Sequence, residues 1–273
     1  MFNKNNPQPG IYNISNEDYH SSAGLSRSAL CELKRSPYHF WHRHLSGEYE
    51  HEEKEAFIFG ESIHTLVLEP HEFEGKFFAS TEKYDRRTKE GKYLHEMMLQ
   101  EAGDRKLISY DKYKSLQLMR QSIHRHPQAL PILSGGEIEQ SIYWIDPNTG
   151  FLCKVRPDIY HNHMAADLKS CDSATPWAFS KAIYDKYYYI QAGMIAEAFK
   201  HVFNVDLKDF LFVCVEKKAP YAVAVYPLDE TAIQKGRSDF KSLLFKYRDC
   251  LEKNEWPMYE TQVITLPTYA MYE

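Results

Sequence analysis

Lys154-Val155-Arg156-Pro157-Asp158 is followed, nine residues after its aspartate, by the aspartate of Met164-Ala165-Ala166-Asp167-Leu168-Lys169-Ser170. Side chains two positions apart in a strand point to the same side, so Asp167 and Lys169 should project together while Leu168 turns into the core. Two carboxylates and one ammonium could then share a pocket. These two runs therefore predict a strand of the core whose charged face forms part of a functional site.

The oxygen atoms in these runs are suited to a hard divalent cation. Mg²⁺ prefers oxygen ligands, so Asp158, Asp167 and the main-chain carbonyl of Leu168 predict a site for Mg²⁺, or for Mn²⁺, with Lys169 beside a metal-bound water. Asp158 could instead end a strand as a turn residue, and Asp167 with Lys169 could form a weak surface pair. The apolar neighbours of Asp167 favour burial, and burying unpaired carboxylates without a cation is costly.

Composition indicates an ordinary globular protein. With 273 residues, 43% of them hydrophobic, we expect one domain over 1–273 that starts with an irregular arm over about 1–24. A formal charge of −5 argues against a generally basic coat, but acidic residues around a metal would lower the total without excluding DNA. The five cysteines contain no Cys-x-x-Cys pair, which favours a reducing cytoplasm over a disulfide framework. No apolar run suggests a signal peptide or membrane anchor.

The order of predicted elements is more informative than their boundaries. Ser26 and Ser36-Pro37 should begin two helices, and an apolar repeat with His64 predicts a third over 54–69 that Pro70 ends. Basic residues indicate a mobile loop over 80–92, followed by helices over 91–101 and 111–125. A hairpin of strands 138–145 and 151–160 should follow, with Pro157 at an edge or bulge, then a strand over 163–169. The remaining predictions are helices over 176–183, 187–203 and 229–251 and strands over 210–215 and 221–226.

This order gives an α/β (α+β) fold with an αβββαβ core, in which a central mixed sheet is flanked by helices and preceded by N-terminal helical additions. With this order of elements, the chain resembles the PD-(D/E)XK nucleases, and among them the C-terminal nuclease domain of exonuclease VIII (RecE). The matching motifs occur in order along nearly the whole chain: 10–20, 24–28, 59–64 with 68–70, 86–88, 141–144, 156–158, 167–169, 188–191 and 255–257. Any one of them is weak evidence, whereas the ordered set is specific.

The resemblance implies roles for particular residues. His64, Asp158 and Asp167 would bind the catalytic metal together with the Leu168 carbonyl, and Lys169 would position or activate the attacking water. A lone histidine on an apolar helix face is more often a hydrogen-bonded core residue, so His64 is considered a ligand only because of the downstream motifs. The implied reaction is hydrolysis of phosphodiester bonds, in which metal and ammonium stabilise the developing charge.

Five further residues could contact DNA or support the site. Gln191 and Tyr188 resemble the family's glutamine-containing helix, although aromatic residues on a helix are more often part of the core. Arg86 and Arg87 could hold phosphate with bidentate geometry or lie in a solvated loop. Glu139 could support the metal ligands, and a surface position on a strand is its plainer interpretation.

The resemblance also implies a biological setting. The expected substrate is linear double-stranded DNA, digested 5′ to 3′ in a bacterial host to supply single strands to a RecT-type annealing protein during phage or prophage recombination. A homo-oligomer, such as a tetrameric ring, would keep the enzyme on DNA. Ser36-Pro37 occupies the place of a Cys-Pro in iron–sulfur relatives, so we expect no iron–sulfur cluster. A restriction or repair endonuclease and a non-catalytic DNA-binding relative remain as alternatives.

Overall fold

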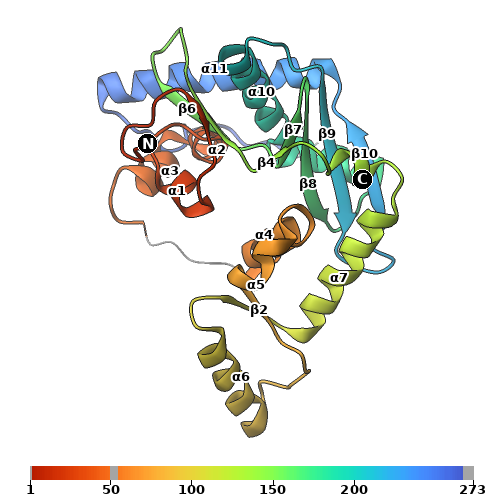
Figure 1. Cartoon of the computed structure of the whole chain (residues 1–273). Coiled ribbons are helices and arrows are strands. Elements are labelled where there is room, and N and C mark those ends of the chain that lie inside the picture. The colour runs from red at the N-terminus through yellow and green to blue at the C-terminus, as the bar shows by residue number, and fades with distance from the viewer. Residues whose placement is uncertain (1, 50–54, 267–273) are drawn as a thin grey trace.

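The structure is a computed structural model that describes residues 2–49 and 55–266. At its centre lies a mixed five-stranded sheet with the strand order β10-β9-β8-β7-β4 (Figure 1). Strands β8 and β9 are parallel, and every other neighbouring pair is antiparallel. The strands are β4 (Glu137–Ile138), β7 (Ile159–His161), β8 (Met164–Cys171), β9 (Asp209–Glu216) and β10 (Val223–Pro227). The predicted mixed sheet is therefore confirmed.

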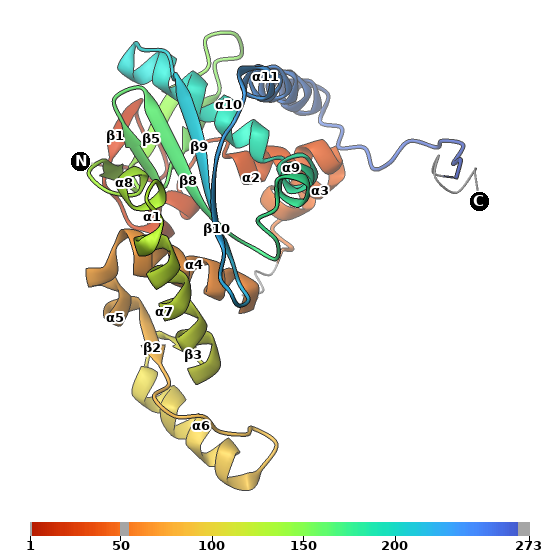
Figure 2. The ribbon, with the colours of Figure 1, turned by 90° about the vertical axis from the view of Figure 1, so that its right-hand side faces the viewer.

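Helices cover both faces of this sheet, as Figure 2 shows from the side of β10. On one face lie α9 (Pro176–Asp185) and α10 (Tyr188–Ala198), with α11 (Glu230–Lys253) behind them. On the other lie α4 (Glu55–Leu68), α7 (Tyr110–Arg125) and α8 (Ala129–Ile132). Because side chains alternate along β8, Ala165 joins the core on the α10 side whereas Ala166 and Leu168 join the core on the α4 side. Asp167 and Lys169 therefore face α10.

A second sheet has the order β1-β5-β6 and is antiparallel throughout. It consists of β1 (Gly10–Tyr12), β5 (Ser141–Ile145) and β6 (Leu152–Val155). The predicted hairpin of two continuous strands is corrected here, because each strand is broken and passes from one sheet to the other. Pro157 has no N–H for the ladder, and Glu139 has a left-handed backbone with φ of 51°. The two breaks are adjacent, since the Glu139 N–H donates to the Asp158 carbonyl at 3.1 Å.

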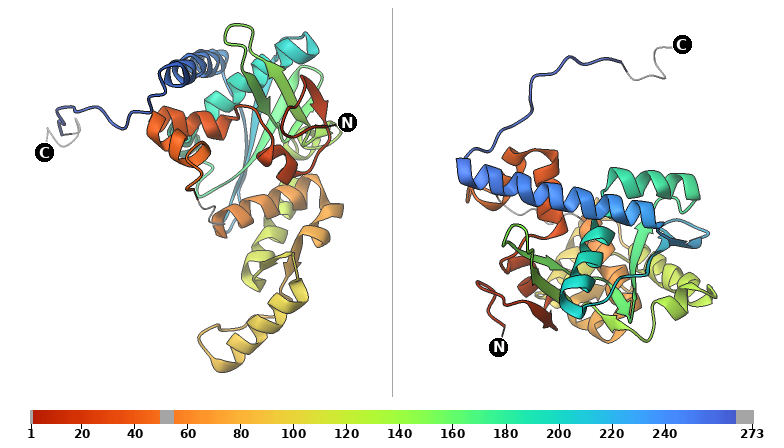
Figure 3. Two further views of the ribbon diagram at one scale, coloured as in Figure 1. Left: turned by 90° about the vertical axis from the view of Figure 1, so that its left-hand side faces the viewer. Right: turned by 90° about the horizontal axis from the view of Figure 1, so that it is seen from above.

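The N-terminal segment is more regular than the sequence suggested. The arm contains β1, which pairs with β5, and the short helix α1 (Asn16–Ser21), whose first turn is capped by the Ser15 hydroxyl. Ser26 and Ser36 cap α2 (Arg27–Arg35) and α3 (Pro37–His44) as predicted. The left view of Figure 3 shows these helices beside the body and above α4.

A smaller lobe projects from the body below α4 (Figures 1 and 2). It contains η1 (Pro70–Glu72), α5 (Phe73–Lys76), β2 (Phe77–Ala79), α6 (Lys89–Ala102) and β3 (Lys106–Ile108), with β2 parallel to β3. Helix α6 begins at Lys89, two residues before the predicted start, because the Thr88 side chain accepts a hydrogen bond from Gly91 N–H. Within the described ranges, no helix is both long and apolar enough to cross a bilayer.

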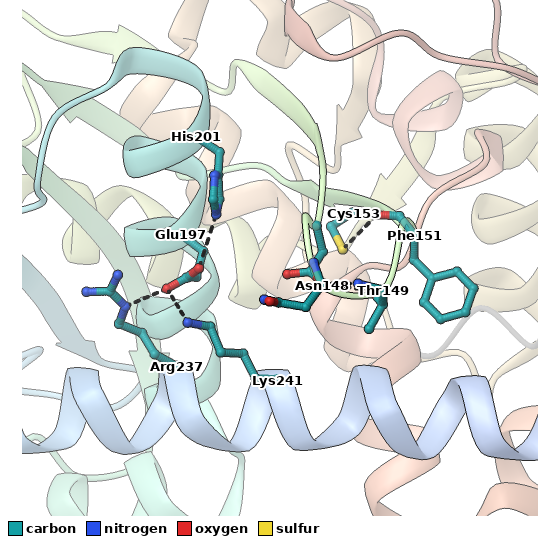
Figure 4. A network of polar contacts seen from close by, with 9 residues as sticks. Asn148, Thr149, Phe151, Cys153, Glu197, His201, Arg237 and Lys241 are labelled. Carbon is teal, nitrogen blue, oxygen red and sulfur yellow. Dashed lines mark hydrogen bonds and ion pairs between the residues drawn. The ribbon is translucent and has the colours of Figure 1, made fainter.

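Helices α10 and α11 are in backbone contact. A Cβ atom on Gly193 would lie 2.3 Å from the Arg237 nitrogen, and one on Gly236 would lie 1.9 Å from the Tyr189 carbonyl oxygen. Near this contact the buried Glu197 carboxylate accepts from Arg237 Nε at 2.6 Å and lies 3.4 Å from the Lys241 ammonium (Figure 4). Helix α10 continues into a π-helical turn, η2 (Phe199–Phe203). Together these contacts fix the helix that faces Asp167.

Candidate active site

His64 and Asp158 meet where α4 reaches the break between β6 and β7. The His64 Nδ1 atom lies 3.3 Å from the Asp158 Oδ2 atom, and that oxygen also accepts from the Leu168 N–H at 2.6 Å. Only 10% of the Asp158 side chain is exposed, compared with 24% for His64. The aspartate is therefore held by the backbone of β8, which is the strand that carries the second aspartate.

Asp167 and Lys169 lie together on β8, as the two-residue period predicts. The Lys169 ammonium forms an ion pair with one Asp167 oxygen, and Gln191 Nε2 of α10 donates to the other. The Lys169 ammonium also lies 4.7 Å from the centre of the Tyr188 ring, a cation–π distance. Gln191 and Tyr188 thus support Asp167 and Lys169 directly.

Glu139 lies closer to His64 and Asp158 than the sequence indicated, and the three residues form a candidate metal-binding group. Ligand atoms of His64, Glu139 and Asp158 all lie within 4.8 Å of one another. The break at Glu139 is bonded to the break at Asp158, which brings two carboxylates from strand runs far apart in sequence to one point. An acidic residue at a strand break opposite a Pro-Asp dipeptide is the sequence signal that would have placed Glu139 here.

Arg156 is a functional candidate that the sequence analysis did not single out. Its Nε atom lies 2.9 Å from the Glu139 Oε2 atom and donates to the Glu139 carbonyl at 2.7 Å. Its remaining nitrogens reach the N-terminal arm. The position of Arg156 two residues before Asp158 was visible in sequence, whereas its partners come from the fold.

The protonation behaviour of the cluster reflects burial. Burial, followed by repulsion from Asp167, raises the pKa of Asp158 to about 6. Burial, followed by repulsion from Asp158, raises the pKa of Glu139 to about 8, although Arg156 opposes the shift. Burial acts to lower the pKa of Lys169, but the Asp167 and Asp158 carboxylates outweigh it and raise that pKa overall. Lys169 is therefore an ammonium at neutral pH.

The donor set fits a divalent cation. The buried Asp158 carboxylate, the partly buried Glu139 carboxylate and the His64 imidazole lie within reach of one ion. A cation there would offset the burial and the repulsion from Asp167 that raise the pKa of Asp158. The Gln191 Oε1 atom is buried without a hydrogen-bond partner in the described structure, so the group retains acceptor capacity. Mg²⁺ or Mn²⁺ suits such oxygen-rich donors.

The cluster opens into a cavity of about 840 Å³. Its wall includes the six site residues His64, Glu139, Asp158, Asp167, Lys169 and Gln191, together with parts of α4 and the N-terminal arm. Arg86 and Arg87 are not part of this wall. Arg86 borders a separate cavity of about 510 Å³, and the exposed Arg87 forms an ion pair with Asp85 at 2.7 Å. The structure therefore does not bring these arginines to the other site residues.

Comparison with solved structures supports the fold. A protein from Eubacterium rectale named "Putative exonuclease" matches with a TM-score of 0.65 over 95% of this chain and 97% of its own, at 14% sequence identity. At that identity the likeness concerns the fold alone. SSO0001 matches over 67% of this chain and 85% of its own at 16% identity, and its TM-score of 0.27 is too low to indicate a shared fold. No protein with curated annotation matches the sequence.

A family model described as "PDDEXK-like domain of unknown function (DUF3799)" matches residues 26–265. That range contains the whole candidate metal-binding group and every described strand except β1. The match confirms the nuclease superfamily that the ordered motifs predicted, while the closer likeness to exonuclease VIII remains a prediction. The match covers most of the chain, and the chain therefore belongs to the PDDEXK-like domain family.

Proposed function

We propose that this protein is a divalent-metal-dependent exodeoxyribonuclease that hydrolyses phosphodiester bonds of linear double-stranded DNA, with 5′-to-3′ polarity. The observation that carries the proposal is the meeting of His64, Glu139 and Asp158 donor atoms within 4.8 Å, next to the ion pair of Asp167 and Lys169. This is the donor chemistry of metal-assisted phosphodiester hydrolysis, in a cavity open to substrate.

Each residue has a definable task in such a reaction. A bound Mg²⁺ would supply a water of lowered pKa and would stabilise charge on the scissile phosphate. Asp158 and His64, with Asp167 or Glu139, would hold the ion, and Arg156 would orient Glu139. Lys169, kept protonated by its two neighbouring carboxylates, would donate hydrogen bonds to the attacking water or to a phosphate oxygen. A role for Lys169 as proton acceptor is disfavoured by its raised pKa.

Action at DNA ends is supported by two indirect observations. The ordered motifs that resemble exonuclease VIII extend beyond the catalytic residues into 10–28 and 255–257. The Eubacterium rectale protein of the same fold also carries the name "Putative exonuclease". A restriction or repair endonuclease would share the catalytic group, so the substrate has to distinguish the two.

The test uses linear duplex DNA labelled at either the 5′ or the 3′ end, with a closed circular duplex in parallel. We expect Mg²⁺-dependent early release of the 5′ label, no cutting of circles, and loss of release in EDTA. Lys169→Ala should abolish release, whereas Lys181→Ala, which removes an exposed lysine paired with Asp185 on α9, should act as native. Cutting of circles would replace the proposal with an endonuclease, and binding without hydrolysis under Mg²⁺ and Mn²⁺ would replace it with a non-catalytic DNA-binding protein.

The resemblance further suggests a homo-oligomer, such as a tetrameric ring, and delivery of single strands to a RecT-type annealing protein in phage or prophage recombination. A ring would explain retention on DNA through topology. Light scattering of the purified protein, with and without linear duplex, measures the assembly. A monomer under both conditions would contradict the ring.

A further inference from the structure

Two basic side chains next to the candidate active site hold residues 10–25, the stretch of the N-terminal arm that runs from β1 through α1 to Leu25. Lys154 and Arg156 are two positions apart in the extended run that ends at Asp158, and both reach main-chain carbonyl oxygens of the arm. Neither contact is part of the pairing between strands. The arm is already attached at its ends, through the pairing of β1 with β5 and through the Leu25 N–H, which donates to the Leu152 carbonyl at 2.8 Å.

Lys154 is nearly buried, with 4% of the residue exposed. Its ammonium donates to the Tyr19 and Ser22 carbonyls, each at 2.6 Å, and lies 3.2 Å from the Ser22 hydroxyl. Its cation also lies 5.0 Å from the centre of the Tyr19 ring. Tyr19 and Ser22 are at the C-terminal end of α1, where helix carbonyls lack intrahelical partners and a cation is favourable. A buried ammonium is costly without hydrogen bonds, and this one obtains its hydrogen bonds from the arm.

Arg156 joins the other end of α1 to the candidate metal site. Its Nη2 atom donates to the Ile14 carbonyl at 2.7 Å, and its Nη1 atom donates to the Ser15 carbonyl at 3.2 Å. Its Nε atom meanwhile contacts both the carbonyl and the carboxylate of Glu139. One planar guanidinium therefore connects the arm to a carboxylate of the metal-binding group, a geometry that lysine cannot reproduce.

The arm forms part of the cavity wall. Asn13, Ser15, Asn16 and His20 line the same cavity as His64 and Asp158, which α4 and the strand break contribute. The side-chain amides of Asn13 and Asn16 are groups that hydrogen-bond the phosphate and sugar oxygens of nucleic acids. Neutral donors placed next to an acidic group would let a polyanion approach where further carboxylates would repel it.

We propose that Lys154 and Arg156 are positioning residues that hold the N-terminal arm as the DNA-binding wall of the catalytic cavity. This inference rests on the proposed function. It assigns the arm a role in substrate binding, with α1 fixed at both ends by cations of the run that leads to Asp158. Loosening the arm should therefore weaken DNA binding more than it slows the chemical step.

The experiment compares the full-length native protein with Lys154→Gln, Lys154→Arg and Arg156→Lys. Arg237→Lys is the matched control, because Arg237 pairs with the buried Glu197 through Nε at 2.6 Å and lies outside the cavity wall. KM and kcat are measured on linear duplex DNA with Mg²⁺. Hydrogen exchange of residues 13–22 and calorimetric Mn²⁺ binding are measured without DNA, and circular dichroism and Tm report folding.

We expect Lys154→Gln to raise KM at least tenfold with kcat and Mn²⁺ affinity within threefold of native, and to speed amide exchange at 13–22. Lys154→Arg should restore much of the affinity, since it keeps a cation at the helix end. Arg156→Lys should speed exchange and raise KM, and should also weaken Mn²⁺ binding because Arg156 contacts Glu139. Arg237→Lys should lower Tm, because it weakens the pairing with buried Glu197, but should leave KM, kcat, Mn²⁺ affinity and amide exchange at 13–22 unchanged.

The proposal fails if folded Lys154→Gln and Arg156→Lys retain native KM and native exchange at 13–22. It also fails if Arg237→Lys raises KM equally, since the effect would then reflect general stability. If Lys154→Gln does not fold, Arg156→Lys and Lys154→Arg decide the outcome by the same readouts. If the native protein binds duplex DNA but does not hydrolyse it, the proposed catalysis fails, while DNA affinity measured by fluorescence anisotropy in place of KM still tests the arm.

Discussion

Replacing Asp158 by asparagine should remove metal-dependent activity and, without metal, make the protein more stable. Asparagine has nearly the same shape, and its oxygen can still accept from the Leu168 N–H, as Asp158 Oδ2 does at 2.6 Å. What it removes is a buried charge. Folding raises the pKa of Asp158 from 3.8 to about 6, so the folded protein binds a proton that the unfolded chain releases. Stability is therefore lost as pH rises through this range.

The expected gain in free energy of unfolding follows from the rise in the pKa of Asp158. A rise of about two pKa units corresponds to roughly 3 kcal/mol, at about 1.4 kcal/mol per unit, once pH is well above 6. Because the loss develops between the two pKa values, about half of it should be present at pH 5. We expect Asp158→Asn to exceed the native protein in free energy of unfolding by up to roughly 3 kcal/mol at pH 8 in EDTA, and by about half as much at pH 5.

Urea unfolding in EDTA at pH 5 and pH 8 measures this difference, with Asp146→Asn as control. Asp146 is also buried, but its carboxylate accepts hydrogen bonds from the Asn148 and Thr149 N–H groups, so its replacement should bring no gain. Mn²⁺ at a hundred times its Kd should stabilise the native protein by about 2.7 kcal/mol and the variant much less. A variant less stable than native at pH 8, or a gain that does not change with pH, would refute the reasoning.

Three further outcomes are expected. His64→Ala should weaken Mn²⁺ binding at least tenfold in calorimetry while far-ultraviolet circular dichroism stays native, and unchanged affinity would remove His64 from the ligand set. Gly236→Ala should lower the free energy of unfolding by about 1–3 kcal/mol or more in urea, because its Cβ would lie 1.9 Å from the Tyr189 carbonyl oxygen. Arg87→Ala should leave Tm unchanged and, if the loop contacts DNA phosphate, should reduce the salt dependence of DNA binding by about one unit of slope; an unchanged slope would exclude that contact.

Much of the fold could be predicted because local signals agree with it. The Ser26 and Ser36 caps, the apolar repeat around His64 and the alternation at Asp167 and Lys169 each depend on residues a few positions apart. Such patterns act through the backbone near them, so they are visible without tertiary structure. The pairing of Asp167 with Lys169 follows from strand period alone.

The site was less predictable where it depends on long-range pairing. Glu139 was interpreted as a supporting or surface residue because its proximity to His64 and Asp158 arises only when two broken strands bond to each other. The role of Arg156 likewise depends on an arm more than a hundred residues earlier in the chain. Arg86 and Arg87 were grouped with the DNA contacts by motif order, yet the structure places them away from the metal-binding group.

The hairpin of β5 and β6, whose strands continue into the other sheet as β4 and β7, restricts where chain length can vary among relatives. One inserted residue between Val155 and Asp158 would turn every later side chain of the strand to the opposite face, moving the Asp158 carboxylate away from His64. A residue added at 147–150, in the turn that joins β5 to β6, would leave the strand breaks at Glu139 and Pro157 in register. Homologous sequences should therefore differ in length at this turn and hold a constant number of residues from 152 to 169.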